Sequence, residues 1–127
     1  MPSLSDHLTK VTHNSRFVAF LSILGRCFPD WIITAQFYAA LHLIDSYLAT
    51  SGRVGVHPGT HHSRGRYIRS DTRLRAVYPD YRDLEELSRF ARYENRLMSR
   101  QDLKDSSVSL VSIRNHVKSL LPPGTIS

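Results

Sequence analysis

The sequence DWIITAQFYAALHLIDSYLAT, residues 30–50, carries the clearest structural pattern in this chain. It follows a proline and begins with aspartate, which favours a helix start because its carboxylate accepts hydrogen bonds from unpaired backbone N–H groups. Apolar residues recur along it three or four positions apart: Ile33, Phe37, Leu41, Ile44 and Leu48. This spacing predicts an amphipathic helix from Asp30 to about Thr50.

The same helical period recurs on both sides of this segment, and no run alternates with the period of two that is typical of a strand. We expect a helix from about Ser5 to Leu24, and a shorter one from about His61 to Val77. Two more are expected from Asp80 to about Arg100 and from about Asp102 to Leu121. The sequence therefore predicts an all-α bundle of four to five helices, with residues 1–127 forming a single domain.

The composition is that of a globular protein with an excess of positive charge. Hydrophobic residues make up 41% and charged residues 22% of the chain. The formal net charge is +6, the isoelectric point is near 9.9, and most of the 17 basic residues are arginine. Arginine donates two parallel hydrogen bonds to a phosphate or carboxylate. The charge favours an anionic partner such as nucleic acid, with an inert basic surface as the alternative.

The sequence contains one cysteine, and no segment of it resembles a signal peptide or a membrane span. The lone cysteine, Cys27, excludes an intramolecular disulfide and a cysteine-based zinc motif. The first ten residues contain an acid and no apolar run, so they do not resemble a signal peptide. The most apolar stretch, residues 31–49, includes glutamine, histidine and aspartate, which indicates a buried helix and not a membrane span. We therefore expect a cytoplasmic protein.

A second row on the 30–50 helix carries polar groups. It lies roughly opposite the apolar row and comprises Trp31, Ala35, Tyr38, His42, Asp45 and Ala49. His42 and Asp45 are one turn apart, and a hydrogen bond between them would fix the imidazole tautomer and raise its pKa. Two interpretations stay open: a functional pair, or a satisfied polar pair inside the bundle or at a dimer seam.

Arginines form a row on the helix expected over residues 80–100. The row comprises Arg89, Arg92, Arg96 and Arg100, spaced three, four and four positions apart and roughly opposite the apolar side. Like charges at this spacing repel one another unless an anion neutralises them. The row predicts a surface that faces phosphate, with a plain solvated face as the alternative.

Histidines and arginines also gather in HPGTHHSRGR, residues 57–66. A zinc site could use these histidines with His42 or Asp45 as a further ligand. Proline and glycine interrupt the spacing, and the chain has no HExxH motif, so we expect no metal or other cofactor. A phosphate or RNA grip, with histidines that exchange protons near neutral pH, and a plain basic loop both stay open.

Three segments together resemble the HEPN family, named for higher eukaryotes and prokaryotes nucleotide-binding, and in particular its small prokaryotic members. The first is a D-W-x5-F-Y-A-A-L-H pattern that begins at Asp30. An H-x-x-R segment follows within HPGTHHSRGR, and the third segment is YPDYRDLEELSRFARYE, residues 78–94. The resemblance covers about Asp30 to Tyr93, and the last expected helix is compatible with it.

The resemblance implies an all-α bundle of four or five helices that pairs as a homodimer. Many HEPN proteins are metal-independent ribonucleases of toxin–antitoxin, CRISPR-associated or antiviral systems, with an R-x4–6-H motif on the last helix. Here Arg114 and Asn115 match the start of that motif, but Leu120 stands at the position of its histidine. No arginine in the chain has a histidine five to seven residues later, so the standard motif is absent.

Two functional hypotheses follow. The first is a protein that binds RNA or a nucleotide in a prokaryotic defence or toxin–antitoxin setting and carries a rebuilt, metal-independent ribonuclease site. Its catalytic residues would be His61, His62, Arg64, His42 and Asp45, and its phosphate-binding residues Arg66, Arg89, Arg92, Arg96, Arg100 and Arg114. The second is a non-catalytic helical interaction module that pairs with a nucleotidyltransferase or an antitoxin-like protein.

Overall fold

The computed structural model describes residues 3–23, 28–50, 61–93 and 97–126, and at residues 22, 23, 61 and 62 it describes the backbone alone. Within these ranges the chain forms five α-helices, one short 3-10 helix and no strand. The elements are α1 (Leu4–Ile23), α2 (Pro29–Thr50), α3 (His61–Ser70), the 3-10 helix η1 (Arg75–Val77), α4 (Tyr78–Tyr93) and α5 (Arg100–Leu120). The all-α architecture expected from the sequence is confirmed for the described part of the chain.

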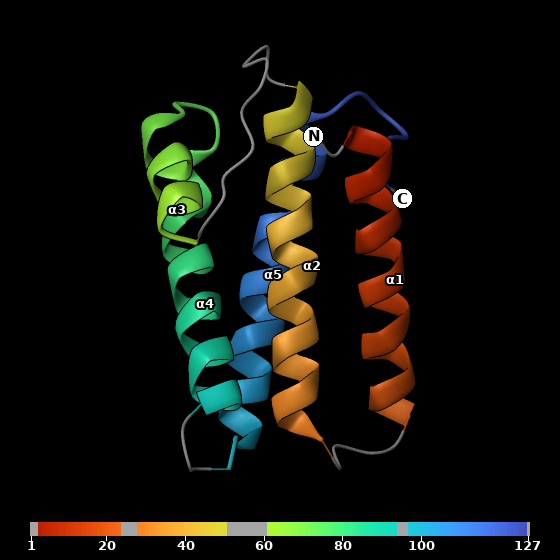
Figure 1. Ribbon diagram of the computed structural model, residues 1–127, viewed down its shortest axis with the longest axis vertical. Helices are drawn as coiled ribbons and strands as arrows, with labels where there is room; N and C mark the ends of the chain where they lie inside the picture. The colour runs from red at the N-terminus through yellow and green to blue at the C-terminus, as the bar shows by residue number, and fades with distance from the viewer. Residues whose placement is uncertain (1–2, 24–27, 51–60, 94–96, 127) are drawn as a thin grey trace.

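The central helix of the bundle is α2 (Figure 1). Helix α1 runs antiparallel beside it, while α4 and α5 pack against it from the other directions. The short α3 packs against α4 and η1 at the end of the bundle where α4 begins. Three neighbours cover α2, which explains why its sequence is the most apolar. No helix in the described ranges is both long enough and apolar enough to cross a membrane.

The core is built around the predicted apolar row of α2. Every member of that row is buried, and Phe37 and Ile44 are completely so. The neighbours that enclose them are Val11 of α1, Ile68 of α3, Tyr81 and Leu84 of α4, and Ile113 and Val117 of α5. Burying one large apolar side chain stabilises a fold by about 1.5–3 kcal/mol, so the buried row of α2 contributes a large part of the hydrophobic stabilisation.

Two polar side chains of α2, Gln36 and Tyr47, form hydrogen bonds with neighbouring elements. The buried amide of Gln36 donates to the Ser107 hydroxyl at 3.0 Å and accepts a hydrogen bond from Ser106. The Tyr47 hydroxyl contacts both oxygens of the buried Asp71 carboxylate at 3.2 Å. A buried polar group without a partner destabilises a fold, so these contacts restrict how α2 sits against α5 and the segment after α3.

Local capping sets several helix ends. Ser3 and Asp6 exchange side chain-to-backbone hydrogen bonds at the start of α1, and Ser99 and Asp102 do the same at α5. Each exchange satisfies backbone N–H groups that the first turn leaves unpaired. Helix α5 ends just before Pro122, which cannot donate a backbone hydrogen bond.

The third long helix ends earlier than the sequence pattern predicted. Arg100 is not its last residue but the first residue of α5, because the Ser99 hydroxyl caps a new helix there. Of the expected arginine row, Arg89 and Arg92 lie on α4, and Arg96 lies outside the described residues. The prediction of four arginines along one helix is therefore wrong.

The helix expected from about His61 to Val77 is interrupted after Ser70. There the Asp71 carboxylate accepts hydrogen bonds from the backbone N–H groups of the next turn, at 2.8 Å from Arg73 and at 3.1 Å from the following leucine. A side chain that binds its own backbone in this way competes with helix continuation. The chain turns at this point and enters η1 and α4.

Candidate functional site

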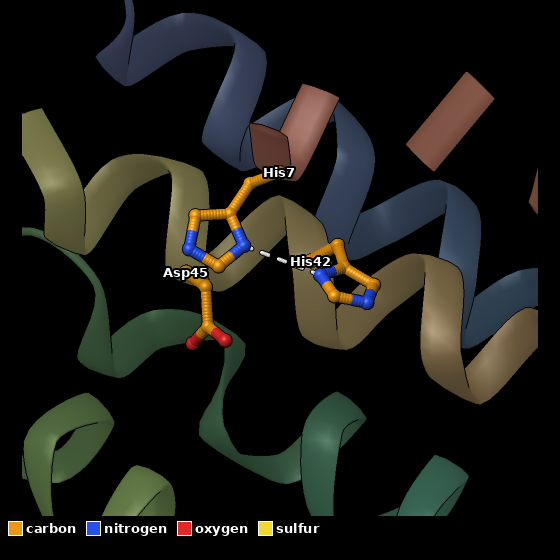
Figure 2. Close-up of side chains that lie close together, drawn as sticks. All are labelled: His7, His42 and Asp45. Atoms are coloured by element: carbon orange, nitrogen blue, oxygen red, sulfur yellow. Dashed lines mark hydrogen bonds between the residues drawn. The ribbon is translucent and has the colours of Figure 1, made fainter. Parts of the chain in front are cut away.

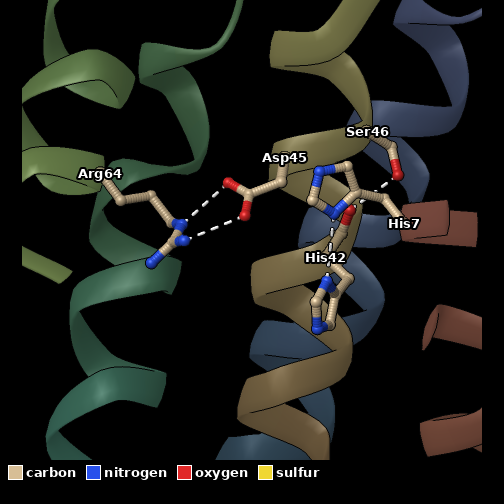
Figure 3. A network of polar contacts seen from close by, with 5 residues as sticks. All are labelled: His7, His42, Asp45, Ser46 and Arg64. Carbon is tan, nitrogen blue, oxygen red and sulfur yellow. Dashed lines mark hydrogen bonds and ion pairs between the residues drawn. The ribbon is translucent and has the colours of Figure 1, made fainter. Parts of the chain in front are cut away.

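Polar side chains are buried along a line that runs from α1 across α2 to α3. They are His7 of α1, His42 and Asp45 of α2, and Arg64 of α3, and we call them the buried polar network (Figures 2 and 3). His7, Asp45 and Arg64 are buried, and His42 is half-buried. The network joins titratable side chains of three helices inside the described part of the bundle.

Asp45 and Arg64 form a two-pronged ion pair. The Nε and Nη2 atoms of Arg64 donate to the two carboxylate oxygens of Asp45, each at 2.9 Å (Figure 3). Burial works against the charge of Arg64, but the hydrogen bonds and charge of Asp45 outweigh burial and raise the pKa of the guanidinium. Arg64 therefore stays charged and fixes the register of α3 against α2.

Tyr81 continues the network toward the surface. Its side chain is fully buried on α4 and hydrogen-bonds both Arg64 and Glu85. Burial raises the pKa of the Tyr81 hydroxyl, so the phenol is neutral at physiological pH. A chain of polar contacts thus links the interior pair to Glu85, which lies half-buried on the same helix.

The two histidines of the network meet through their Nδ1 atoms, which lie 3.2 Å apart (Figure 2). One nitrogen of each ring and one carboxylate oxygen of Asp45 all lie within 4.8 Å of one another. Burial, together with the charge of His7, lowers the pKa of His42 to about 4, and the opposing effect of Asp45 is smaller. His42 is therefore neutral near pH 7.

The geometry differs from the pairing expected of His42 and Asp45. The hydrogen bonds of the Asp45 carboxylate go to Arg64, while the His42 ring contacts His7. The pKa of His42 is lowered and not raised, because burial outweighs the nearby carboxylate. The expected direction of this shift was wrong.

His7 is the member of the network that the sequence pattern did not reveal. It lies 35 positions before His42, so no local spacing connects the two. One signal was available: His7 stands next to Leu8 and four residues before Val11, on the side of α1 that faces the core. A histidine in such a row is expected to be buried and to need a polar partner.

The predicted phosphate-binding arginines are spread over different surfaces. Arg89 is exposed on α4 and Arg100 is exposed at the start of α5. The half-buried Arg92 donates to the Tyr38 hydroxyl at 3.1 Å, and its guanidinium lies 5.1–5.9 Å from the centres of three aromatic rings. Arg114 is half-buried and lines a groove beside α1. These arginines do not share one surface.

Arg66 is exposed on α3, whereas the side chains of His61 and His62 lie outside the described residues. These two histidines are the first residues of α3, one turn before Arg64. His116, which stands near the incomplete motif of the last helix, donates from Nε2 to the backbone carbonyl of Arg73 at 2.6 Å. That contact joins α5 to the segment between α3 and α4.

A hollow of about 350 Å³ lies between α3 and α4, and we call it the basic hollow. Its lining residues are Gly65, Arg69, Tyr78, Tyr81, Arg82, Glu85, Glu86 and Arg89. The guanidinium of Arg69 lies 5.2 Å from the centre of the Tyr78 ring. Arg82 hydrogen-bonds Tyr78, and this bond raises the pKa of its guanidinium. Arg69 and Arg82 therefore both contact Tyr78, and Arg89 lines the same hollow together with Tyr81, which belongs to the chain of contacts from the buried network.

Positive charge continues from the hollow along α3 and the segment after it. Arg66, Arg73 and Arg75 are exposed there. The only acidic residue between positions 61 and 77 is Asp71, and its carboxylate is buried against Tyr47. The exposed residues of α3 and of the segment up to Val77 therefore include arginines and no acid.

Comparison of the chain with protein-family models, with curated proteins and with solved structures gives no significant match.

Proposed function

We propose that this chain is a HEPN-like helical domain that binds RNA, and that it holds RNA phosphates at the basic hollow. The observation that carries the proposal is that Arg69, Arg82 and Arg89 line one hollow, where the first two contact Tyr78. The sequence resemblance and the all-α architecture support the HEPN-like assignment. The excess of arginine over the whole chain is in keeping with an anionic ligand.

The lining of the hollow offers the two kinds of contact that single-stranded RNA uses. Arginine forks bind phosphate oxygens in a bidentate manner, and the half-buried ring of Tyr78 provides a face on which a base can stack. Glu85 and Glu86 oppose part of the positive charge, but the exposed arginines along α3 extend it beyond the hollow. A phosphate chain longer than one nucleotide fits this distribution better than a single phosphate group.

Arg64 has an indirect role in this proposal. Its guanidinium is engaged by Asp45 inside the protein, and it also hydrogen-bonds Tyr81 in the wall of the hollow. Arg64 and Asp45 are thus positioning residues, which hold α3 and Tyr81 where the exposed arginines can act together.

The test is a binding measurement with a fluorescently labelled single-stranded RNA, read by anisotropy. Replacing Arg69, Arg82 and Arg89 together by glutamine should weaken binding at least ten-fold, because three charge-assisted phosphate contacts are lost. Glutamine keeps a polar end group and part of the aliphatic stem of arginine and is a good helix former, so the helices should remain folded.

The matched control removes the same charge elsewhere. Lys10, Arg16 and Lys118 are exposed on α1 and α5, away from the hollow, and are replaced together by glutamine. This variant should bind RNA within about two- to three-fold of the unmodified protein, since long-range charge effects are screened at physiological salt. Equal losses in both variants would mean that net charge, and not the hollow, holds the RNA.

Cleavage is read from the same samples with end-labelled RNA in EDTA. Products that end in a 2′,3′-cyclic phosphate, and that disappear when His61 and His62 are replaced by alanine, would add metal-independent ribonuclease activity to the binding function. In such a site histidine moves protons while arginine holds the phosphate. Intact RNA that is still bound would leave the domain as a binding module.

A second candidate function, a protein-interaction module, is favoured by exposed aromatic residues at one end of the α1–α2 pair. Phe17 and Phe20 lie near the end of α1, and Phe28 and Trp31 lie at the start of α2. The Trp31 side chain is 56% exposed, which is unusual for the largest apolar residue. Exposed aromatic residues of this kind occur at the centres of protein interfaces.

Replacing Phe20 and Trp31 by serine tests this candidate, with light scattering over a concentration series as the measurement. A homodimer that dissociates in this variant while RNA binding persists would assign the aromatic residues to self-association. If the unmodified protein and the variant have the same mass at every concentration, these aromatic residues do not mediate self-association.

A further inference from the structure

Three side chains of the buried polar network are arranged as the ligands of a metal ion would be. They are His7, His42 and Asp45, and their donor atoms lie within 4.8 Å of one another (Figure 2). The two imidazoles approach through the same atom, Nδ1, at 3.2 Å. Two nitrogens bound to a tetrahedral zinc ion at about 2.0–2.1 Å lie about 3.3–3.4 Å apart, close to this separation.

From this geometry we infer that His7, His42 and Asp45 form a binding site for Zn²⁺. Two imidazole nitrogens and one carboxylate oxygen are a donor set that zinc accepts, and three protein ligands leave a fourth tetrahedral position for water. The site joins α1 to α2, the two helices that supply its ligands.

The surroundings of the three ligands suit this role. Ligation uses one ring nitrogen of each histidine, and the Nδ1 atoms of His7 and His42 already face each other at 3.2 Å. Carboxylates that bind metal ions are commonly hydrogen-bonded on their remaining lone pairs, and Arg64 occupies that position at Asp45. The ion pair between Arg64 and Asp45 thus holds the carboxylate ligand in place inside the protein.

A plain hydrogen bond between the two histidines is the competing explanation of the 3.2 Å contact. It accounts for the histidine pair, and the ion pair with Arg64 accounts for the place of the Asp45 carboxylate, so the zinc titration decides between the two explanations. The inference does not rest on RNA binding, because the ligands lie inside the bundle and the basic hollow lies between α3 and α4.

The first experiment titrates the full chain, freed of metal by EDTA and then of EDTA by gel filtration, with ZnCl₂ in a calorimeter. We expect one equivalent to bind. His42→Gln should weaken binding at least ten-fold, because one of the three ligands is lost. His42 is chosen because it is half-buried and can be replaced with less disturbance than a fully buried residue. Circular dichroism checks that the variant is folded.

Two control variants separate this site from other histidines. His13 is exposed on α1, the helix that carries His7, so His13→Gln should bind zinc as the unmodified protein does. A variant with His57, His61 and His62 all replaced by glutamine should also keep full affinity. Binding that survives His42→Gln but is lost in the triple variant would overturn the inference.

The second experiment needs no variant and therefore does not depend on the folding of a mutated core. In ¹⁵N-labelled protein, long-range ¹H–¹⁵N correlation spectra resolve the two ring nitrogens of each histidine. Adding Zn²⁺ should shift the Nδ1 resonances of His7 and His42 and leave those of His13 and His116 in place. Folded protein that binds no zinc, or shifts confined to other histidines, would contradict the site.

Discussion

At the scale of single residues, the interior of this protein depends on a buried pair of opposite charges. Asp45 and Arg64 are almost completely removed from solvent and satisfy each other through two hydrogen bonds. Such a pair adds little stability compared with apolar residues of the same size, but removing one partner leaves a buried charge without compensation. The pair therefore specifies the position of α3 more than it stabilises the fold.

Arg64→Met should lower the free energy of unfolding by about 3–5 kcal/mol, because the Asp45 carboxylate would stay buried without its partner. Adding Asp45→Asn to that variant should recover part of the loss, since the uncompensated charge is then removed. Urea unfolding followed by circular dichroism measures both. A loss below about 1 kcal/mol in the single variant would show that the pair is open to water.

The neutral state of His42 makes stability depend on pH. Its pKa is about 4 in the folded protein, against 6.5 for an ordinary histidine, so the unfolded chain binds a proton more readily. The contribution of the neutral His42 to the free energy of unfolding is fully present above pH 6.5. It is lost as the pH falls through that value toward about 4. Because His42 is half-buried and partly screened, we expect a loss of about 1–2 kcal/mol.

The measurement is urea unfolding in EDTA at about pH 7 and at about pH 4.5. Comparing the unmodified protein with His42→Gln separates the contribution of His42 from that of the carboxylates. The unmodified protein should lose more stability than the variant over this interval. Equal losses would mean that His42 titrates as an exposed histidine does.

At the scale of helices, the sequence predicted most of the fold. The apolar residues of α2 recur at regular helical spacing, and prolines and capping residues mark the ends of several helices. The limits of α1 and α2 agree with expectation within one or two residues. The helix expected from Asp80 to about Arg100 was wrong at its end, because α4 ends at Tyr93 and Arg100 begins α5. Ser99 and Asp102 carried the contrary signal, a serine followed three residues later by an acid, which is typical of a helix start.

Ser99→Ala tests whether that cap sets the start of α5. Two hydrogen bonds join Ser99 and Asp102, at 3.0 Å to the serine hydroxyl and at 2.8 Å to the carboxylate, and the first is lost in the variant. We expect the free energy of unfolding to fall by about 1 kcal/mol. As a matched control, Ser119→Ala should change it by less than about 0.5 kcal/mol, because this exposed serine of α5 donates to the His116 carbonyl of its own helix. Equal effects would remove the special role of the cap.

At the scale of the whole molecule, the contacts of the buried polar network join residues far apart in the sequence. Local spacing brought His42 and Asp45 to one side of α2, and the structure adds His7 from α1 and Arg64 from α3. A helical period describes one element at a time, so it could not reveal which elements would share the network. The basic hollow was missed for the same reason, because it needs α3 to fold back on α4.

The salt dependence of RNA binding tests the proposed function most directly. Each phosphate contact with a single strand contributes about −0.7 to the slope of log affinity against log salt concentration. Replacing Arg69, Arg82 and Arg89 by glutamine should make the slope shallower by about 2, while the Lys10, Arg16 and Lys118 variant should keep the slope of the unmodified protein. The same slope in all three proteins would contradict RNA binding at the basic hollow.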